Sequence, residues 1–581
     1  MELRPLTALF GLLALVSCGG QPGADTGTPG QVTAGDLPWI VSAAHPLAVE
    51  AGARVLGEGG SAVDAAIAVQ AVLGLVEPQS SGLGGGAFML HYDASSGTLT
   101  AYDGREHAPA SVTPDVFLKD DGSPMGFFEA VLSGKAVGVP GVVAMLDMAH
   151  RDHGRLAWSE LFTDAETLAR DGFAMPGRLH DYLGRLRPFR EDPQAAVFLD
   201  DDGAPLPVGA RVRNPAYAET IRQLAEEGAQ LFYTGAVAEA IITRVNERTG
   251  ETTMTAEDFA AYRPVRRQAV CAVVALRKVC SMPPPSSGGI TLLQIMQLFD
   301  MRSEAAAPED DLLSYLEATR LAYADRGRFL GDPAAMGTDG VSADDLVDAL
   351  ISTDYLTGRL ELIGAAPADT IPPGEPVPSR PLREGRIDGT PYELPSTSHF
   401  SIRDSAGNIV SMTTSVEMPF GSQMMAAGMV LNNQLTDFSR NPGEGAARAV
   451  NAPGPRKRPL SSMTPVIVFD AAGEPVTAIG SPGGPAIIGY VAKPLLDHLM
   501  SGRPLSETII EPHVVIPRGS LLIETGGEEL ARRAEAIGYE VTVRDLSSGL
   551  YGFSVHDGEI DLAVDPRREG AALTGSLPAD Q

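Results

Sequence analysis

One change in sequence character, close to residue 397, constrains the fold more than any other feature. Residues 130–350 alternate amphipathic helical stretches with short loops, as in 217–227 and 312–326. Residues 366–395 are rich in proline and glycine and have no periodicity, which is typical of an exposed segment. The chain beyond them has the pattern of strands. We therefore expect a mainly helical half that serves as a cover, and a strand-rich centre that begins at Thr397.

Two strands are predicted directly after this change, joined by a turn at 404–408. Thr397 begins the first strand. On the second strand, the two-residue period places Ser411, Thr413 and Ser415 on one face. Such a row of hydroxyl groups fits a solvent-facing strand surface, and it also fits a polar functional site.

The threonine that opens the first strand is a candidate nucleophile. A threonine hydroxyl reacts weakly near neutral pH and needs an adjacent base, which a free α-amine on the same residue supplies without a histidine. If Thr397 attacks the carbonyl of Ser396, the peptide becomes an ester that water cleaves. Thr397 then becomes a new N-terminus. Such a cleavage would explain why an exposed segment, 366–395, comes just before Thr397.

Two glycine-rich stretches call for different interpretations. GSPGG at 480–484 follows a strand expected to end at Ile479 and precedes a helix expected from Pro485. The amides of Gly483 and Gly484 would suit a tetrahedral oxyanion, although a tight strand-to-helix turn explains the same residues. In SSGLGGGAFMLHYD the glycines precede a strand instead of opening a helix, which argues against a phosphate loop or a dinucleotide site.

The first folded segment is expected to be helical and then extended. Residues 46–75 predict two helices, separated by the glycine-rich stretch 57–60. Ser61 is expected to cap the second helix, and Asp64 completes a capping box. A strand over 98–103 would then deliver Arg105 at its exit.

The N-terminus has the pattern of a secretion signal. Arg4 precedes an apolar stretch over 6–16, which is too short to anchor the chain across a bilayer. The stretch ends in LVSC, and a glycine-rich tether over 18–36 follows. This is typical of a bacterial lipoprotein signal, residues 1–17, cleaved before a lipid-bearing Cys18. A plain signal peptide with an incidental cysteine is the alternative.

Charge and cysteine content narrow the classes of ligand. The net charge of −30 is spread along the chain, which disfavours a nucleic-acid partner. No HExxH, paired CxxC or His/Asp cluster at ligand spacing is present in the sequence, so a metal site is not supported. Cys271 and Cys280 suit a disulfide across a short hairpin, and they equally suit two buried free thiols.

Several motifs follow one another in a characteristic order: GGSAVDAAIAV, EPQSSGLGGGAFML, YDGREHAP, SMPPPSSGG, AYADRGRFLGDP, TSHFSI, LNNQLTDFS, KRPLSSMTP, GSPGG and DPRREGAAL. Through them the chain, from about residue 37 to its end, resembles the γ-glutamyltransferases, or glutathione hydrolases, of the N-terminal-nucleophile hydrolase superfamily. The resemblance implies an α+β fold, a four-layer αββα sandwich. It also implies autocatalytic cleavage of one precursor into a large subunit, 37–396, and a small catalytic subunit, 397–581.

The resemblance further implies roles for single residues. The cut would fall between Ser396 and Thr397, and the catalytic set would be Thr397 as nucleophile with Gly483, Gly484 and Ser415. A γ-glutamyl head is a zwitterion, so a guanidinium opposite a carboxylate suits both of its ends. The implied contacts of its α-carboxylate are Arg105, Ser461 and Ser462, and those of its α-amine are Asp437 with Gln434 nearby. Glu417 adds a carboxylate near the expected amine site, which would either strengthen binding of the zwitterion or favour another substrate.

Some positions depart from the commonest family pattern. Ser415 and Glu417 stand where well-known members carry threonine and asparagine, and Pro485-Ala486 stands where serine and arginine are usual. Residues 439–456 contain no aromatic residue, whereas some relatives close the site with a tyrosine-bearing lid. We expect a more open site that admits water and bulkier γ-glutamyl compounds.

The implied activity is cleavage of γ-glutamyl amides such as glutathione without a cofactor, with transfer of the acyl group to water, amino acids or dipeptides. The expected location is the periplasm or the outer membrane, with membrane contact only through the lipid. A glutaryl (cephalosporin) acylase is one alternative, which Asp437 disfavours because such substrates lack the α-amine. A surface lipoprotein that binds such ligands without turning them over is the other.

Overall fold

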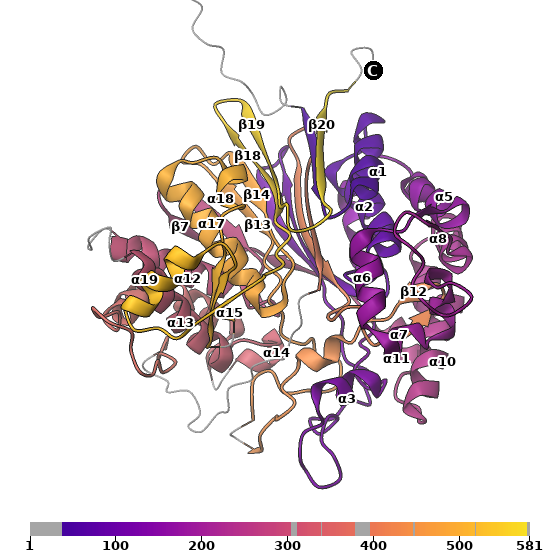
Figure 1. Cartoon of the computed structure of the whole chain (residues 1–581), viewed down its shortest axis with the longest axis horizontal. Helices are drawn as coiled ribbons and strands as arrows, with labels where there is room; N and C mark the ends of the chain where they lie inside the picture. Colours follow the sequence, from indigo (N-terminus) through magenta and orange to yellow (C-terminus); the bar gives the residue numbers. More distant parts are fainter. Residues whose placement is uncertain are drawn as a thin grey trace, which may run out of the picture.

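The structure is a computed structural model that describes residues 38–303, 311–337, 340–377, 396–445, 448–517 and 519–577. Two β-sheets lie face to face at its centre, and a layer of helices covers the outer face of each (Figure 1). The expected signal peptide, the tether with Cys18, and residues 378–395 lie outside the described residues.

The first sheet has seven strands and interleaves the two halves of the chain. Its order is β20-β1-β9-β10-β2-β3-β6, with each neighbouring pair antiparallel. The strands β9 and β10, which follow residue 396, lie between β1 and β2, which precede it. The strand bounds are β1 (Trp39–Ala43), β2 (Gly86–Asp93), β3 (Thr98–Gly104), β6 (Val265–Gln268), β9 (Ser398–Arg403), β10 (Ile409–Ser415) and β20 (Ala571–Gly575).

The second sheet has six strands in the order β19-β18-β14-β13-β8-β7. Its hairpin β7–β8 belongs to the half of the chain that we expected to be mainly helical, and it carries the disulfide Cys271–Cys280. The paired alternative for the two cysteines is therefore confirmed. The strand bounds are β7 (Val270–Val274), β8 (Arg277–Ser281), β13 (Val466–Phe469), β14 (Pro475–Ile479), β18 (Tyr551–His556) and β19 (Glu559–Val564).

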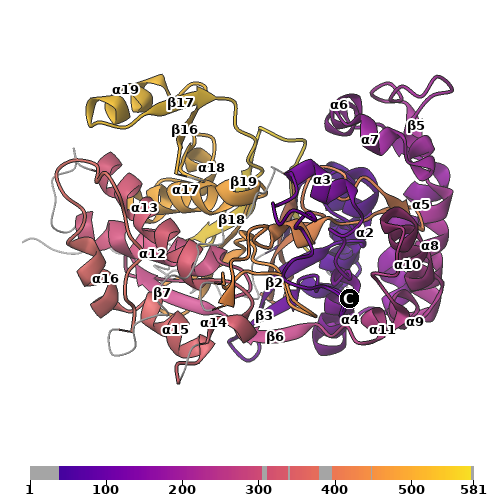
Figure 2. The same ribbon diagram turned by 90° about the horizontal axis from the view of Figure 1, so that it is seen from below.

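The main helices form two layers. α1 (Pro46–Gly57), α2 (Ala62–Val76) and α4 (Val142–His153) pack on the seven-stranded sheet, and α12 (Gly288–Ser303) packs on the six-stranded sheet beside α13 (Asp311–Phe329) and α17 (Ile487–Ser501). Figure 2 shows the layers from below. The helix α2 begins where predicted, because Ser61 and Asp64 exchange the two hydrogen bonds of a capping box.

Shorter elements surround these layers. The helices are α3 (Phe127–Leu132), α5 (Thr163–Asp171), α6 (Gly177–Arg185), α7 (Arg187–Arg190), α8 (Pro215–Glu227), α9 (Gln230–Thr234), α10 (Ala236–Thr249), α11 (Ala256–Ala260), α14 (Pro333–Met336), α15 (Ala343–Leu350), α16 (Thr353–Leu360), α18 (Leu505–Thr508) and α19 (Glu528–Ala536). The strands are β4 (Phe173–Ala174), β5 (Arg211–Val212), β11 (Met425–Ala426), β12 (Met429–Val430), β15 (Val514–Val515), β16 (Leu521–Glu524) and β17 (Val541–Arg544). Among the described residues, no helix is long and apolar enough to cross a membrane.

The core between the sheets draws on both halves of the chain. Phe88 and Ile409 from the first sheet pack with Ile467 and Ile479 from the second, all of them fully buried. Because each half supplies only part of each sheet, neither half can complete this core alone. The two segments expected from the sequence thus form one interlocked unit, and the inner strands fix the position of residue 397.

The predicted hydroxyl row on β10 is buried and does not face solvent. Ser411 Oγ donates to the carbonyl of Ile479, Thr413 Oγ1 lies 2.8 Å from His399 Nδ1, and Ser415 Oγ lies 2.9 Å from Thr397 Oγ1. The row therefore faces the second sheet, and its last hydroxyl reaches the candidate nucleophile. The solvent-facing interpretation is wrong.

Candidate active site

Thr397 immediately precedes β9 and lies beside the end of β10. Its Oγ1 is 2.9 Å from Ser415 Oγ, which accepts a hydrogen bond from the backbone N–H of Glu417 at 2.9 Å. Either hydroxyl can donate in the Thr397–Ser415 contact, because the bond from Glu417 leaves Ser415 its proton and a second lone pair. Thr397 is only 4% exposed, so this contact holds its hydroxyl group in one place.

Hydrogen bonds hold the intact Ser396–Thr397 peptide from several sides. The Gly483 N–H donates to the Ser396 carbonyl oxygen at 3.3 Å, and the Thr397 N–H donates to Ser80 O at 3.1 Å. On the far side, Arg568 Nη1 donates to Thr397 O at 2.9 Å. The carbonyl that Thr397 would attack therefore already faces the amide predicted to stabilise an oxyanion.

The backbone at this peptide is strained. Thr397 has φ of 93°, a conformation that a β-branched residue adopts only when its surroundings impose it. Such a residue stores about 1–3 kcal/mol of strain. Cleavage before Thr397 removes the peptide bond that defines this angle, so the strain favours the cut.

Position 483 accepts only glycine, because of its backbone angle and because of the space around its Cα atom. Its φ is 138°, and a Cβ atom there would lie 2.5 Å from the ring of Tyr490. A short 3-10 turn, Gly484–Ala486, follows it, and α17 begins at Ile487, two residues after the predicted start. The predicted strand end at Ile479 is confirmed.

A buried ion pair forms the other end of the site. Arg105 follows β3, as predicted, and its Nη2 donates to Asp437 Oδ2 at 2.6 Å and to Leu460 O at 2.7 Å. Its Nε donates to Pro459 O at 3.1 Å. Both charged side chains are at most 2% exposed, so the pair is shielded from water and salt.

Two buried oxygens beside this pair have no hydrogen-bond partner among the described residues. They are Asp437 Oδ1 and Gln434 Oε1, and Gln434 Nε2 donates to the other oxygen of Asp437 at 2.7 Å. Burial raises the pKa of Asp437, against the opposing effects of Arg105 and Gln434. Unsatisfied buried acceptors are costly, and an ammonium group would satisfy both.

The two serines lie on the segment that faces Arg105. Ser461 Oγ accepts from Met463 N at 3.1 Å, and Ser462 Oγ accepts from Arg326 Nη2 at 2.8 Å. Arg326 comes from α13, in the half that we expected to be only a cover, and it also donates to Ser287. That expectation is wrong here, because a strand-and-helix layer from the first half supports the site directly.

One small cavity gathers nearly all the predicted residues. Glu417 lies at its wall with φ of 81°, and its Oε2 accepts from Asn433 Nδ2. The lining residues are Arg105, Thr397, Ser415, Glu417, Gln434, Asp437, Ser461, Ser462, Met463, Gly484 and Ile487. Within the described ranges, no group of three or more His, Cys, Asp or Glu side chains is arranged to hold a metal ion.

Sequence reasoning gave no role to three residues that lie against the site. Arg568 holds the Thr397 carbonyl, Arg326 holds Ser462, and the carboxyl of Glu106 is fully buried 3.8 Å from Arg105 Nη1. Burial raises the pKa of Glu106 to about 8. Each of the three residues lies inside a motif on which the family resemblance rests: DPRREGAAL, AYADRGRFLGDP or YDGREHAP. The motifs therefore pointed to these positions, although the sequence did not indicate what each residue does.

His399, two residues after Thr397, does not contact the nucleophile by any hydrogen bond in the described structure. Its Nδ1 lies 2.8 Å from Thr413 Oγ1, its Nε2 lies 3.2 Å from Ser401 Oγ, and burial lowers its pKa to about 3. The imidazole is therefore neutral and held by hydroxyl groups. The free α-amine of Thr397 remains the candidate base.

The fold and the site together define a class. Two stacked sheets between helical layers, with a threonine at the start of an inner strand and an amide facing the preceding carbonyl, are the architecture of the N-terminal-nucleophile hydrolases.

Comparison with known proteins identifies the family within that class. The family model described as gamma-glutamyltranspeptidase matches residues 48–575. The glutathione hydrolase proenzyme of Bacillus subtilis (strain 168) is 34% identical over 556 residues, which cover 92% of this chain and 91% of that protein. The chain therefore belongs to the γ-glutamyltranspeptidase family.

Solved structures confirm the fold. A cephalosporin acylase from Bacillus halodurans matches with a TM-score of 0.78 at 23% identity, over 92% of this chain and 96% of that chain. The γ-glutamyltranspeptidase of Helicobacter pylori matches with a TM-score of 0.50 at 32% identity, over 57% of this chain and 92% of that chain. At 23% identity, the likeness to the cephalosporin acylase shows a shared fold only.

Proposed function

We propose that this protein is a glutathione hydrolase and γ-glutamyltransferase that works through a γ-glutamyl ester on Thr397. One observation carries the proposal. The cavity that holds the Thr397 side chain also holds a buried guanidinium–carboxylate pair with unsatisfied acceptors, which suits a zwitterionic head group. Its family membership supports the same activity.

The first step makes the nucleophile. Thr397 Oγ attacks the Ser396 carbonyl carbon, and the resulting oxyanion accepts from the Gly483 N–H that already faces this oxygen. The C–N bond breaks, the hydroxyl proton passes to the departing nitrogen, and an ester remains. Water hydrolyses this ester, which leaves a carboxylate on Ser396 and a free α-amine on Thr397 beside Ser80 O.

The same groups then act on substrate. The α-amine takes the proton of Thr397 Oγ as the oxygen attacks the γ-carbonyl carbon, and Gly483 and Gly484 stabilise the oxyanion. The amide C–N bond breaks, the leaving amine takes the proton, and an ester remains. Water, an amino acid or a dipeptide resolves this ester and restores the free hydroxyl.

The buried pair would recognise the γ-glutamyl head. The α-ammonium would approach Asp437 Oδ1 and Gln434 Oε1, the two acceptors that have no partner. The α-carboxylate would face Arg105 with Ser461 and Ser462. A zwitterionic substrate is favoured at this buried pair because an incomplete match leaves a buried charge unpaired.

The test is turnover of a γ-glutamyl anilide with and without a dipeptide acceptor. We expect turnover, and a higher rate with the acceptor. Thr397→Ala should remain a single chain without activity, whereas Thr414→Val, which removes a neighbouring buried hydroxyl, should be processed and active. An active Thr397→Ala variant would refute the proposal.

A glutaryl acylase is the second candidate, because a cephalosporin acylase shares the fold. Glutaryl compounds carry no α-amine and would leave Asp437 Oδ1 unsatisfied. We therefore expect a γ-glutamyl anilide to exceed the glutaryl anilide in kcat/KM by about 100-fold or more. The reverse preference would favour the acylase.

The proposal for the location rests on residues outside the described structure. We propose export and a lipid on Cys18, supported by the apolar stretch over 6–16 and the glycine-rich tether. Cys18→Ser should release the protein from membranes. Continued membrane association of this variant would contradict a lipid anchor at Cys18.

A further inference from the structure

Two segments of the small cavity leave the same end of one hairpin. The strands β13 and β14 are antiparallel neighbours, and Val466 lies opposite Ile479. The segment 461–463, with the two serines expected to hold the head group, precedes β13, and the turn 483–486, with the two oxyanion glycines, follows β14. Both segments line the cavity. We call them the head-group segment and the oxyanion turn.

One turn of the helix α13 reaches both segments. Tyr323 OH donates to Pro485 O at 2.6 Å, within the oxyanion turn. Three residues later on the same side of the helix, Arg326 donates from Nη2 to Ser462 Oγ and from Nε to Ser287 Oγ, each at 2.8 Å. The guanidinium carbon of Arg326 lies 5.8 Å from the centre of the Tyr323 ring, so the two side chains also support each other.

The head-group segment is held through further buried bonds. Ser287 donates to Ser461 O from Oγ at 2.6 Å and from its backbone N–H at 2.8 Å. Arg326, Ser287 and Ser462 are each at most 2% exposed. Moving the segment would leave buried polar groups unpaired, which is costly. This end of the cavity is therefore fixed to α13.

The oxyanion turn needs support from outside because its own backbone is permissive. Gly483 and Gly484 both have positive φ, 138° and 58°, and glycine reaches many neighbouring conformations at little cost. The ring of Tyr490 limits the turn on one side, since it lies close to the Cα atom of Gly483. The bond from Tyr323 to the carbonyl of Pro485 holds the turn at its far end. The direction of the two amides thus depends on α13.

We propose that Tyr323 is a positioning residue that, together with Arg326, fixes the distance between the oxyanion turn and the head-group segment. The site then selects a γ-glutamyl chain over a β-aspartyl chain. This inference rests on the proposed function and adds the residue that sets the accepted chain length. The β-aspartyl chain lacks one methylene and is shorter by up to about 1.5 Å, one C–C bond. With both ends of the site fixed, it cannot reach the oxyanion amides and the head-group contacts together, and a misplacement of about 1 Å can cost roughly 100-fold in rate.

The test compares a γ-glutamyl anilide with the β-aspartyl anilide in the wild type and in Tyr323→Phe, which removes only the hydroxyl group. The readout is the ratio of the two kcat/KM values, which does not depend on the amount of processed or folded enzyme. We expect the wild type to prefer the γ-glutamyl compound by about 100-fold or more. Tyr323→Phe should lose about tenfold of this ratio, mainly through a lower kcat for the γ-glutamyl compound.

Tyr315→Phe is the matched control. Tyr315 lies on the same helix, and its hydroxyl group donates to Val514 O at 3.4 Å, away from the residues that line the cavity. The control should keep the wild-type ratio. An unchanged ratio in Tyr323→Phe, or an equal fall in Tyr315→Phe, would overturn the role of Tyr323.

A binding measurement separates this inference from the proposed function. Calorimetry with L-glutamate and L-aspartate needs no turnover, and the side-chain carboxylate of each would face the oxyanion turn. We expect the wild type to bind glutamate more tightly, and Tyr323→Phe to lose severalfold of this preference. Equal binding of both by the wild type, or an unchanged preference in Tyr323→Phe, would overturn the inference. If neither anilide is hydrolysed but the preference for glutamate falls in Tyr323→Phe, the role of Tyr323 stands and the proposed function fails.

Discussion

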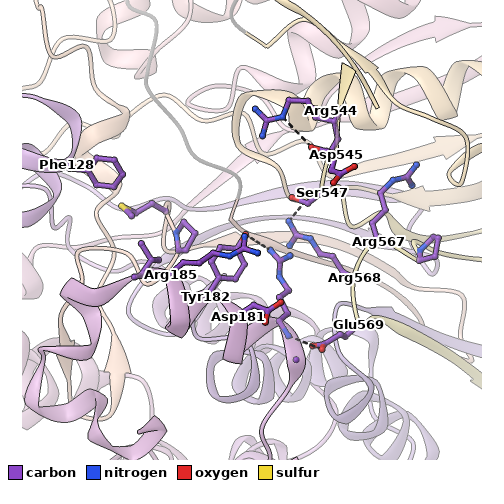
Figure 3. A pocket seen from close by; sticks show the side chains of 17 residues that line it. Phe128, Asp181, Tyr182, Arg185, Arg544, Asp545, Ser547, Arg567, Arg568 and Glu569 are labelled. Carbon is purple, nitrogen blue, oxygen red and sulfur yellow. Dashed lines mark hydrogen bonds between the residues drawn. The ribbon is translucent and has the colours of Figure 1, made fainter. Parts of the chain in front are cut away.

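The molecule holds cationic side chains in two contrasting places on either side of Thr397. In the small cavity, Arg105 is 1% exposed and tied to Asp437 and two carbonyl groups. In a cleft of about 890 Å³ lined by α6 and the segments 544–547 and 566–569 (Figure 3), Arg185 and Arg544 are exposed and lie on separate segments. Buried charges have lost their water and need a matching partner, whereas exposed ones attract any anion weakly. The first place therefore suits selection of one charged head group, whereas the second gives weaker and less selective attraction.

The largest effect that separates the two places should come from the buried pair. Arg105→Ala would leave the substrate carboxylate without its charged partner, a loss of about 2–4 kcal/mol, or roughly 30- to 1000-fold in kcat/KM. Asp437→Ala should behave alike. The double variant should lose less than the sum of the two, since both residues hold one small head group. Turnover of a γ-glutamyl anilide measures this.

Processing supplies the matching control for these variants, because self-cleavage involves no zwitterionic head. Fragment formation should therefore survive in Arg105→Ala and Asp437→Ala. Arg151→Ala breaks a surface ion pair with Asp147 and should change neither readout. Near-normal kcat/KM in Arg105→Ala would remove the assignment of the glutamyl site and favour the acyl-amide candidate.

A further expected effect is on stability in acid. Burial lowers the pKa of His399 to about 3, so the folded protein keeps this imidazole neutral, while the unfolded chain protonates it below about 6.5. The unfolded state binds more protons in this range, and stability therefore falls as pH drops from 6.5 towards 3. One such group contributes about 1.4 kcal/mol per pH unit.

Thermal melting between pH 6.5 and pH 4.5 measures this contribution. On acidification, the melting temperature of His399→Gln should fall by less than that of the wild type. His556→Gln is the control, because His556 is highly exposed. If both variants and the wild type show the same dependence on pH, His399 does not contribute as described.

The sequence predicted most of the fold where local signals were strong. The two helices with their capping box, the strand that leads to Arg105 and the strand pair after Thr397 all occur as expected. The hairpin β7–β8 was only one of two alternatives for its cysteines, because short strands inside a mainly helical stretch carry little periodicity. Its pairing with β13 is a long-range contact that no local pattern encodes.

For the site as well, the sequence predicted some features and left others out. The residues of the small cavity were found from motifs, and the structure brings them together. The roles of Arg568 and Arg326 depend on which atoms they reach, Thr397 O and Ser462 Oγ, and a sequence pattern does not specify that. The cleft is assembled from α6 and two segments near the C-terminus, so its charge emerges only in three dimensions.

The central claim is that Thr397 becomes the N-terminal residue of a catalytic fragment, and N-terminal sequencing of the purified protein tests it most directly. We predict two fragments in equal amounts, of which the smaller spans 397–581 and begins Thr-Ser-His-Phe. Thr397→Ala should give one uncut chain. A wild-type protein that is fully active as a single intact chain would contradict the claim, because no free α-amine would then exist on Thr397.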